Sequence, residues 1–100
     1  MRSTLCLDLY VVDTLMADLV GHDRSPSSFL VYLALAARAR GRKPPRAVVS
    51  HRDLAEDTGL SKSSVQAAIR NLSRRRLVAA SRASATAVPE YTVLRPWRGR

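Results

Sequence analysis

The apolar positions near the N-terminus change from an alternating to a helical spacing. Leu5, Leu7 and Leu9 alternate with other residues, so residues 4–9 are expected to form a short strand or an extended arm. Apolar residues three and four apart then predict an amphipathic helix over residues 10–20, which Gly21 is expected to end. These residues are Val11, Val12, Leu15, Met16 and Leu19. Asp13 and Asp18 fall on the polar face of this helix.

A second helix is expected from Pro26 to about Arg40. Ser25 is a suitable N-cap, and proline suits the first helical position. The nine apolar residues from Phe29 to Ala37 leave the helix almost no polar face, and a helix that is apolar all round is buried on both sides. In a chain of 100 residues, either the first helix covers one of these sides or a second subunit does. The sequence leaves both alternatives open.

Two more helices with a tight turn between them are expected over residues 50–75. Ser50, with Asp53 three residues later, is a capping pair for a short helix that Gly59 can end in a left-handed conformation. Ser61 is the next N-cap, and Leu60 before it can pack on Val65. One apolar stripe at helical spacing follows. It consists of Val65, Ala68, Ile69 and Leu72.

Three short strands complete the expected fold. Residues 46–49, which precede the helix pair, are short and β-branched, and residues 77–80 and 90–94 read as a hairpin. In the last strand Tyr91 and Val93 fall on one face, while Thr92 and Leu94 fall on the other. The expected fold is mainly α with a small β-hairpin wing (α+β): a winged helix-turn-helix with two extra N-terminal helices.

The charge is unevenly distributed. The formal net charge is +9; residues 1–37 hold two basic and four acidic side chains, and residues 38–100 hold fifteen basic and four acidic ones. The halves therefore carry −2 and +11, and the basic part suits a polyanion such as nucleic acid. The acidic first helix is expected to stay away from such a partner. The basic loop over residues 38–45 either is solvated or contacts phosphate.

The outer face of the helix over residues 61–75 carries no carboxylate. Its side chains are small, polar or cationic, so this face can approach a polyanion and hydrogen-bond to base edges. They are Lys62, Ser63, Gln66, Ala67, Arg70 and Arg74. The alternative interpretation is an ordinary helical hairpin with a solvated outer face. The two caps around one glycine turn and the arginine run over residues 74–76 favour the helix-turn-helix.

Residues 54–78, LAEDTGLSKSSVQAAIRNLSRRRLV, resemble the helix-turn-helix signature of winged-helix bacterial regulators of the GntR and MarR type. They are also similar to winged-helix modules of phage and plasmid replication proteins. The resemblance implies double-stranded DNA as the partner. Such proteins usually have glycine where Arg76 stands, so this arginine must either adopt a left-handed conformation, at about 1 kcal/mol, or end the helix differently.

The remaining chemistry of the sequence points away from catalysis. Cys6 is the only cysteine, which excludes an internal disulfide or a cysteine-cluster zinc site, and it is expected to be a partly buried, inert thiol. His22 and His51 belong to no metal-spaced set, and no phosphate-binding glycine motif occurs. Neither an enzyme nor a cofactor is expected. Acids interrupt the early apolar runs, and the longest apolar run is too short to span a bilayer, so we expect a cytoplasmic, nucleoid-associated protein and no membrane partner.

These patterns lead to one functional hypothesis with two alternatives. The hypothesis is a DNA-binding protein, most simply a small transcriptional regulator that reads the major groove with the helix over residues 61–75 and contacts the backbone with the wing. The alternatives are a replication or partition module of a phage, virus or plasmid, and a winged helix that binds an acidic protein. A homodimer through the N-terminal helices is expected, and the sequence identifies no small-molecule effector.

Specific residues are assigned to each part of this hypothesis. The predicted base-facing residues are Ser63, Ser64, Gln66, Ala67 and Arg70. The predicted backbone contacts are His51, Arg52, Ser61, Lys62, Arg74 and Arg82. The chain is divided into an N-terminal arm with helices (1–45), a DNA-binding part (46–95) and a basic tail (96–100), all within one domain. In the tail, Trp97 is expected to pack over a neighbouring helix, and its arginines are expected to be solvated.

Overall fold

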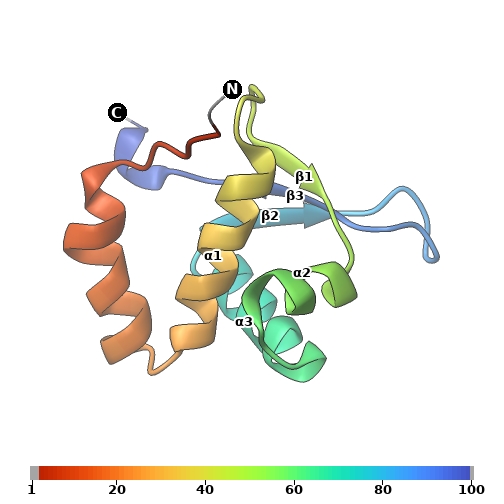
Figure 1. The fold of residues 1–100 in the computed structure, drawn as a ribbon, viewed down its shortest axis with the longest axis horizontal. Helices are drawn as coiled ribbons and strands as arrows, with labels where there is room; N and C mark the ends of the chain where they lie inside the picture. The colour runs from red at the N-terminus through yellow and green to blue at the C-terminus, as the bar shows by residue number, and fades with distance from the viewer. Residues whose placement is uncertain (1–2, 100) are drawn as a thin grey trace.

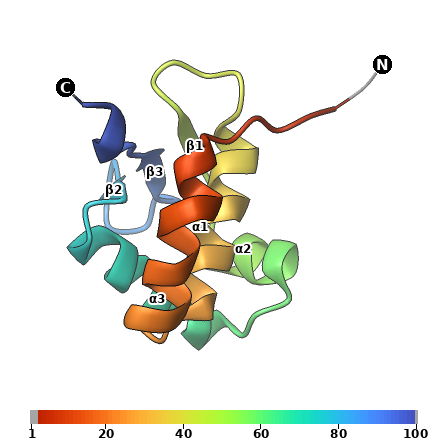
Figure 2. The same ribbon diagram turned by 90° about the vertical axis from the view of Figure 1, so that its left-hand side faces the viewer.

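The computed structural model describes residues 3–99 as a mainly helical fold with a small three-stranded antiparallel sheet. Helix α1 (Pro26–Ala39) lies at the centre. An N-terminal helical segment packs on one side of it, and α2 (His51–Thr58), α3 (Lys62–Arg74) and the sheet lie on the other (Figures 1 and 2). This arrangement confirms the predicted fold class.

The N-terminal helix, by which we mean residues 9–22, contains two widened turns, η1 (Val11–Leu15) and η2 (Asp18–His22). In both, backbone N–H groups donate to carbonyls five residues back, as from Asp23 to Asp18 at 2.9 Å. Residues 3–8 before it have no regular structure, so they form the extended arm and not the strand. The prediction that Gly21 ends the helix is wrong. The helix ends after His22, where Arg24 takes a positive φ of 52° and Ser25 N–H donates to Leu19.

Most of α1 is buried within one chain, although Leu30 in its apolar run is 42% exposed. Its most buried residues include Val31 and Leu35, each with no exposed surface, and the N-terminal helix covers the side that α2 and α3 leave open. Ser25 caps the helix as predicted, because its Oγ accepts from the Ser28 backbone N–H. The structure therefore fulfils the first alternative for α1, and a second subunit is not needed to cover it.

The helix-turn-helix forms as the sequence predicts. The Ser50 Oγ accepts from Asp53 N–H at 3.0 Å, and α2 ends at Gly59, whose φ of +79° is left-handed. The Ser61 Oγ accepts from Ser64 N–H at 3.1 Å at the start of α3. All four residues of the predicted stripe of α3 are buried. The domain core thus forms between this stripe, α1 and Leu54 of α2.

The strands pair in the order β1-β3-β2, all antiparallel. They are β1 (Arg46–Val48), β2 (Val78–Ser81) and β3 (Glu90–Val93). Ala47 pairs with Tyr91, and Ala80 pairs with the same residue from the other side. Tyr91 and Val93 are buried on one face, as predicted. The loop between β2 and β3 extends away from the helices as the wing (Figure 1).

The C-terminal tail closes against the N-terminus. Trp97, in the short helix η3 (Pro96–Arg98), stacks on Tyr10 with ring centroids 4.6 Å apart, so the tryptophan packs on a helix as predicted. The indole N–H donates to Asp8 at 2.7 Å, and Arg98 forms an ion pair with the same carboxylate. Arg98 is therefore not merely solvated, because its guanidinium holds the arm to the tail. Arg100, the other end of the predicted basic tail, lies outside the described residues.

Two further expectations concern the surface. Cys6 lies in the extended arm and is exposed, so the prediction of a partly buried thiol is wrong. Within residues 3–99, no helix is long and apolar enough to cross a membrane.

Candidate nucleic-acid interface

The outer face of α3 is exposed along its whole length. Five of its side chains are exposed and two are half-buried. The exposed ones are Lys62, Ser63, Ala67, Arg70 and Arg74, and the half-buried ones are Ser64 and Gln66. The buried stripe fixes this orientation, because residues three and four apart share one face of a helix. All five predicted base-facing residues therefore lie on or beside one continuous face without a carboxylate.

The serines at the start of α3 form a small hydroxyl cluster. The Ser61 Oγ lies 3.2 Å from the Ser63 Oγ and donates to the Ser64 Oγ at 3.0 Å, besides capping the helix. The hydroxyl of Ser61 is thus engaged inside the protein. In this conformation Ser61 could contact a phosphate through its backbone N–H, or through its hydroxyl if the hydroxyl rotated outward.

His51 begins α2 and joins it to the sheet. Its Nε2 lies 3.1 Å from the hydroxyl of Tyr91 on β3. Burial lowers the pKa of His51 below its ordinary value of 6.5, and the nearby positive charges of Arg82 and Lys62 lower the pKa further. His51 is therefore neutral at neutral pH, so its ring can offer a phosphate a hydrogen bond but no positive charge.

A shallow hollow lies between the helix-turn-helix and the wing. It has a volume of about 400 Å³ and presents an apolar floor with polar groups at its edge. The lining residues are His51, Ile69, Ala80, Ser81, Arg82, Pro89 and Tyr91. Arg82 is exposed, and among the residues that the structure describes its guanidinium donates only to the Ala85 carbonyl in its own loop, at 3.3 Å. The structure thus brings Arg82 and His51, predicted separately as backbone contacts, to one hollow.

Arg52 and Arg74 differ in how strongly the protein holds them. Arg52 lies 3.8 Å from Glu56 one turn along α2, and its side chain is 84% exposed, so this pair contributes little and leaves Arg52 able to reorient. Arg74 is exposed as a residue, yet its guanidinium donates to the Asn71 side-chain oxygen. A phosphate contact by Arg74 therefore competes with a bond inside the domain.

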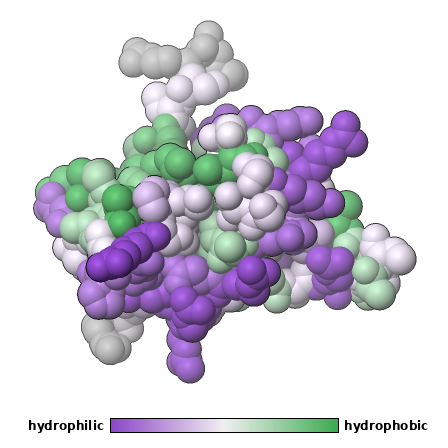
Figure 3. All heavy atoms as spheres, turned by 90° about the horizontal axis from the view of Figure 1, so that it is seen from below, coloured by the Kyte–Doolittle hydropathy of each residue, from purple (hydrophilic) through white to green (hydrophobic). Residues whose placement is uncertain are grey.

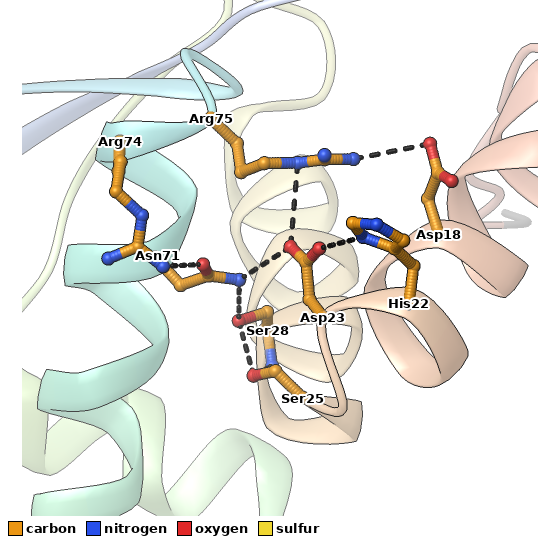
Figure 4. Close-up of polar contacts among 8 residues, drawn as sticks. All are labelled: Asp18, His22, Asp23, Ser25, Ser28, Asn71, Arg74 and Arg75. Carbon is orange, nitrogen blue, oxygen red and sulfur yellow. Dashed lines mark hydrogen bonds and ion pairs between the residues drawn. The ribbon is translucent and has the colours of Figure 1, made fainter.

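The arginine run at the end of α3 contains a structural residue that sequence reasoning missed. Arg75 forms ion pairs with Asp18 at 3.2 Å and Asp23 at 3.4 Å, both at the end of the N-terminal helix (Figure 4). Asn71, which is buried, donates to Asp23 at 3.1 Å and to the fully buried Ser28 hydroxyl at 3.0 Å. This network ties α3 to the N-terminal helix and α1.

The sequence did contain a signal for the buried position of Asn71, because this polar residue lies within the apolar stripe of a helix. It stands beside Leu72 and three residues after Ala68, where a solvated side chain is not expected. The ion pair between Arg38 of α1 and Asp57 of α2, at 2.5 Å, had no comparable signal, because its members are nineteen residues apart. Asp57 thereby neutralises one cation of the basic segment over residues 38–45.

A cavity that the sequence did not indicate lies at the other end of the molecule. It has a volume of about 450 Å³ and lies between the extended arm, α1 and the C-terminal tail. Its walls include Tyr32 and Trp97, together with Arg40 and Arg95. The burial of Tyr32 raises its pKa to about 12, and its hydroxyl donates to the Leu94 carbonyl at 3.1 Å. This phenol therefore stays protonated, and it ties α1 to the residue that follows β3.

Comparison with known proteins agrees with this geometry. Residues 25–78 match the family described as a helix-turn-helix domain, which is more than half of the chain. The matched segment runs from the cap of α1 through β1, α2 and α3 to the first residue of β2. No curated protein and no solved structure matches, so the comparisons do not single out the GntR or MarR types. A helix-turn-helix domain indicates DNA binding and is typically non-enzymatic, and this chain belongs to the helix-turn-helix domain family.

Proposed function

We propose that this protein is a small transcriptional regulator that binds double-stranded DNA as a winged helix-turn-helix. The observation that carries the proposal is the exposed outer face of α3, which has serine, glutamine, alanine, lysine and arginine side chains but no carboxylate. A recognition helix of this kind enters the major groove with such a face, where side chains meet base edges. The wing follows on the same side as the hollow that contains His51 and Arg82.

The side chains of α3 suit different parts of the groove. Gln66 can pair with adenine, Arg70 with guanine, and the methyl group of Ala67 can contact a thymine methyl. Ser63 and Ser64 complete the base-facing set. The backbone contacts then come from the edges of the interface: His51, Arg52, Ser61, Lys62, Arg74 and Arg82. Because phosphate contacts fix register without reading sequence, this division predicts two kinds of variant.

Two single substitutions separate the two kinds of contact. The variant Arg70→Ala should lose about 1–3 kcal/mol of binding free energy at one base position, whereas Lys62→Ala should weaken binding to all sequences alike. A matched control is Arg24→Ala, which removes the same charge from an exposed residue in the turn before α1, outside α3 and the wing. The measurement is fluorescence anisotropy with a duplex selected from a random library and with a scrambled duplex. If Arg70→Ala and Lys62→Ala both bind like the control, α3 is not the recognition helix.

Salt dependence tests the backbone contacts as a group. Four of the six assigned backbone contacts are cationic, so the logarithm of affinity should fall against the logarithm of salt concentration with a slope of about −4 per module. A slope near zero would refute DNA binding through this surface. Weak binding of random duplex at low salt, with tight binding of an acidic protein, would instead favour a protein-interaction module.

The family match also keeps a second role open, a replication or partition module of a phage, virus or plasmid. The matched segment includes α1, and a long helix ahead of the helix-turn-helix is the feature that resembles those modules. Selection from random duplexes separates the roles. A single palindromic operator supports the regulator, whereas a preference for tandem repeated sites supports the replication module. In either role we propose that the protein acts as a homodimer on the nucleoid, in the cytoplasm.

A further inference from the structure

The N-terminal helix has a second apolar stripe that the fold leaves uncovered. Its first stripe, Val11, Leu15 and Leu19, is buried against α1. Beside it run Val12, Met16 and Val20, which are 50%, 36% and 38% exposed, and Leu9 at one end is 71% exposed. Apolar side chains accordingly gather at the upper left of Figure 3, over this helix. An uncovered apolar stripe along a helix is a candidate interaction site.

The widened turns of this helix make the second stripe straight. In an α-helix, residues four apart drift around the axis because the period is 3.6 residues. In η1 and η2 the backbone bonds span five residues, so each turn takes up more of the chain. Val12, Met16 and Val20, spaced by four, therefore lie close to one line along the helix. A straight stripe suits packing against another straight helix.

Charge argues for a second copy of this chain as the occupant. Each copy carries a net charge of +9, so two copies repel each other wherever cations face one another. Residues 3–23 contain no lysine or arginine. Residues 3–23 hold four aspartates, and three of them, Asp8, Asp18 and Asp23, form ion pairs with Arg98 or Arg75 of the same chain. Arg24 follows directly after this segment. The stripe itself carries no charged side chain, so two copies can meet on it without bringing their basic surfaces together.

We infer that this second stripe is a homodimer interface, on which the N-terminal helix of another copy packs antiparallel about a two-fold axis near Met16. An isologous interface must be self-complementary, so each residue meets its mirror position. With Met16 at the centre, Met16 faces its own counterpart, and Val12 faces Val20 of the other copy. Both pairings are apolar, as a desolvated interface core requires.

The dimer would leave both DNA-binding faces free. The N-terminal helix and the wing lie at opposite ends of the longest dimension of the domain, which is 37 Å between Cα atoms (Figure 1). Two copies joined at their N-terminal helices therefore carry their wings at the outer ends of the dimer. This consequence bears on the proposed DNA-binding function, whereas the interface itself does not rest on it.

The test is the oligomeric state in solution, measured by sedimentation equilibrium without DNA. The unaltered protein should be a dimer at tens of micromolar. Val12→Asp places a charge in the interface and should raise the dissociation constant on the order of a hundredfold. The matched control is Val48→Asp on β1, because Val48 is 57% exposed, similar to Val12. Circular dichroism of both variants establishes that they remain folded.

A cross-link tests the position of the two-fold axis. In a Cys6→Ser background, which removes the only natural cysteine, Met16→Cys should form a disulfide-linked dimer on mild oxidation. Val48→Cys in the same background should stay monomeric under denaturing conditions. A monomeric unaltered protein overturns the proposal, and so does a dimer that Val12→Asp leaves intact or a cross-link that forms equally at residue 48. None of these results bears on DNA binding, because no DNA is present.

Discussion

Asn71 offers the sharpest test of how α3 is held in the domain. The substitution Asn71→Ala removes one donor group that bonds to the Asp23 carboxylate at 3.1 Å and to the Ser28 hydroxyl at 3.0 Å. It also removes the acceptor for Arg74. The helix itself should remain, since alanine is the best helix former. Any loss of stability therefore reports on the contacts between α3, α1 and the N-terminal helix.

The expected loss follows from the two bonds of the side-chain amide. A hydrogen bond to a charged group contributes about 1.5–3 kcal/mol, and one between neutral groups about 0.5–1.5 kcal/mol. Ser28 keeps its bond to the Ser25 hydroxyl at 2.6 Å, and Asp23 keeps Arg75 and His22, so neither group is orphaned. We therefore expect the free energy of unfolding to fall by roughly 2–4 kcal/mol.

The assay is urea unfolding followed by circular dichroism. Its control is Ser73→Ala, which lies two residues further along the same helix, is exposed and should change stability by less than about 0.5 kcal/mol. A loss for Asn71→Ala no larger than that of Ser73→Ala would refute the reasoning, because it would mean that the network in Figure 4 contributes nothing to the fold.

Two further perturbations test single residues. Arg76→Gly should raise the free energy of unfolding by roughly 0.5–1 kcal/mol, because the φ of Arg76 is +57°, whereas Arg74→Gly inside α3 should lower it by about 1 kcal/mol. If the two variants changed stability equally in thermal unfolding, the backbone at Arg76 would not be strained. The pKa of His51 is lower in the folded state than its ordinary value of 6.5. The stability that the neutral imidazole contributes is therefore complete above pH 6.5 and is lost as the pH falls below that value. His51→Gln should therefore lose less stability than the unaltered protein between neutral pH and about pH 5, and identical urea-unfolding profiles would exclude His51 as a source of the pH dependence.

The helix-turn-helix could be read from the sequence because its determinants are local. Ser50 and Ser61 cap the helices that follow them, and Gly59 supplies the left-handed turn between them. Each of these residues acts on backbone groups within a few positions of itself, so their spacing along the chain is enough to predict the motif. The exposed face of α3 follows in the same way, since the buried stripe fixes which side faces outward.

Other outcomes depended on residues that are distant in sequence. Arg76 had two ways to end α3, and the structure shows the left-handed one, with Leu77 N–H donating to the Leu72 carbonyl as β2 begins. Arg75 stands in the arginine run over residues 74–76, yet it pairs with Asp18 and Asp23, more than fifty residues away. Sequence spacing says nothing about such pairs, because the tertiary fold brings them together.

The sequence by itself determined the elements, their caps, the inward faces of the helices and the basic surface, since all of these follow from local spacing and composition. Only the tertiary structure decided what covers α1. The apolar residues all round α1 were compatible with cover by a partner subunit or by the first helix. In the structure the first helix covers α1 within the same chain. As a result, the apolar surface that remains uncovered lies on the N-terminal helix, at Val12, Met16 and Val20. A helix that buries one stripe against the core must leave its neighbouring stripe to solvent or to another molecule.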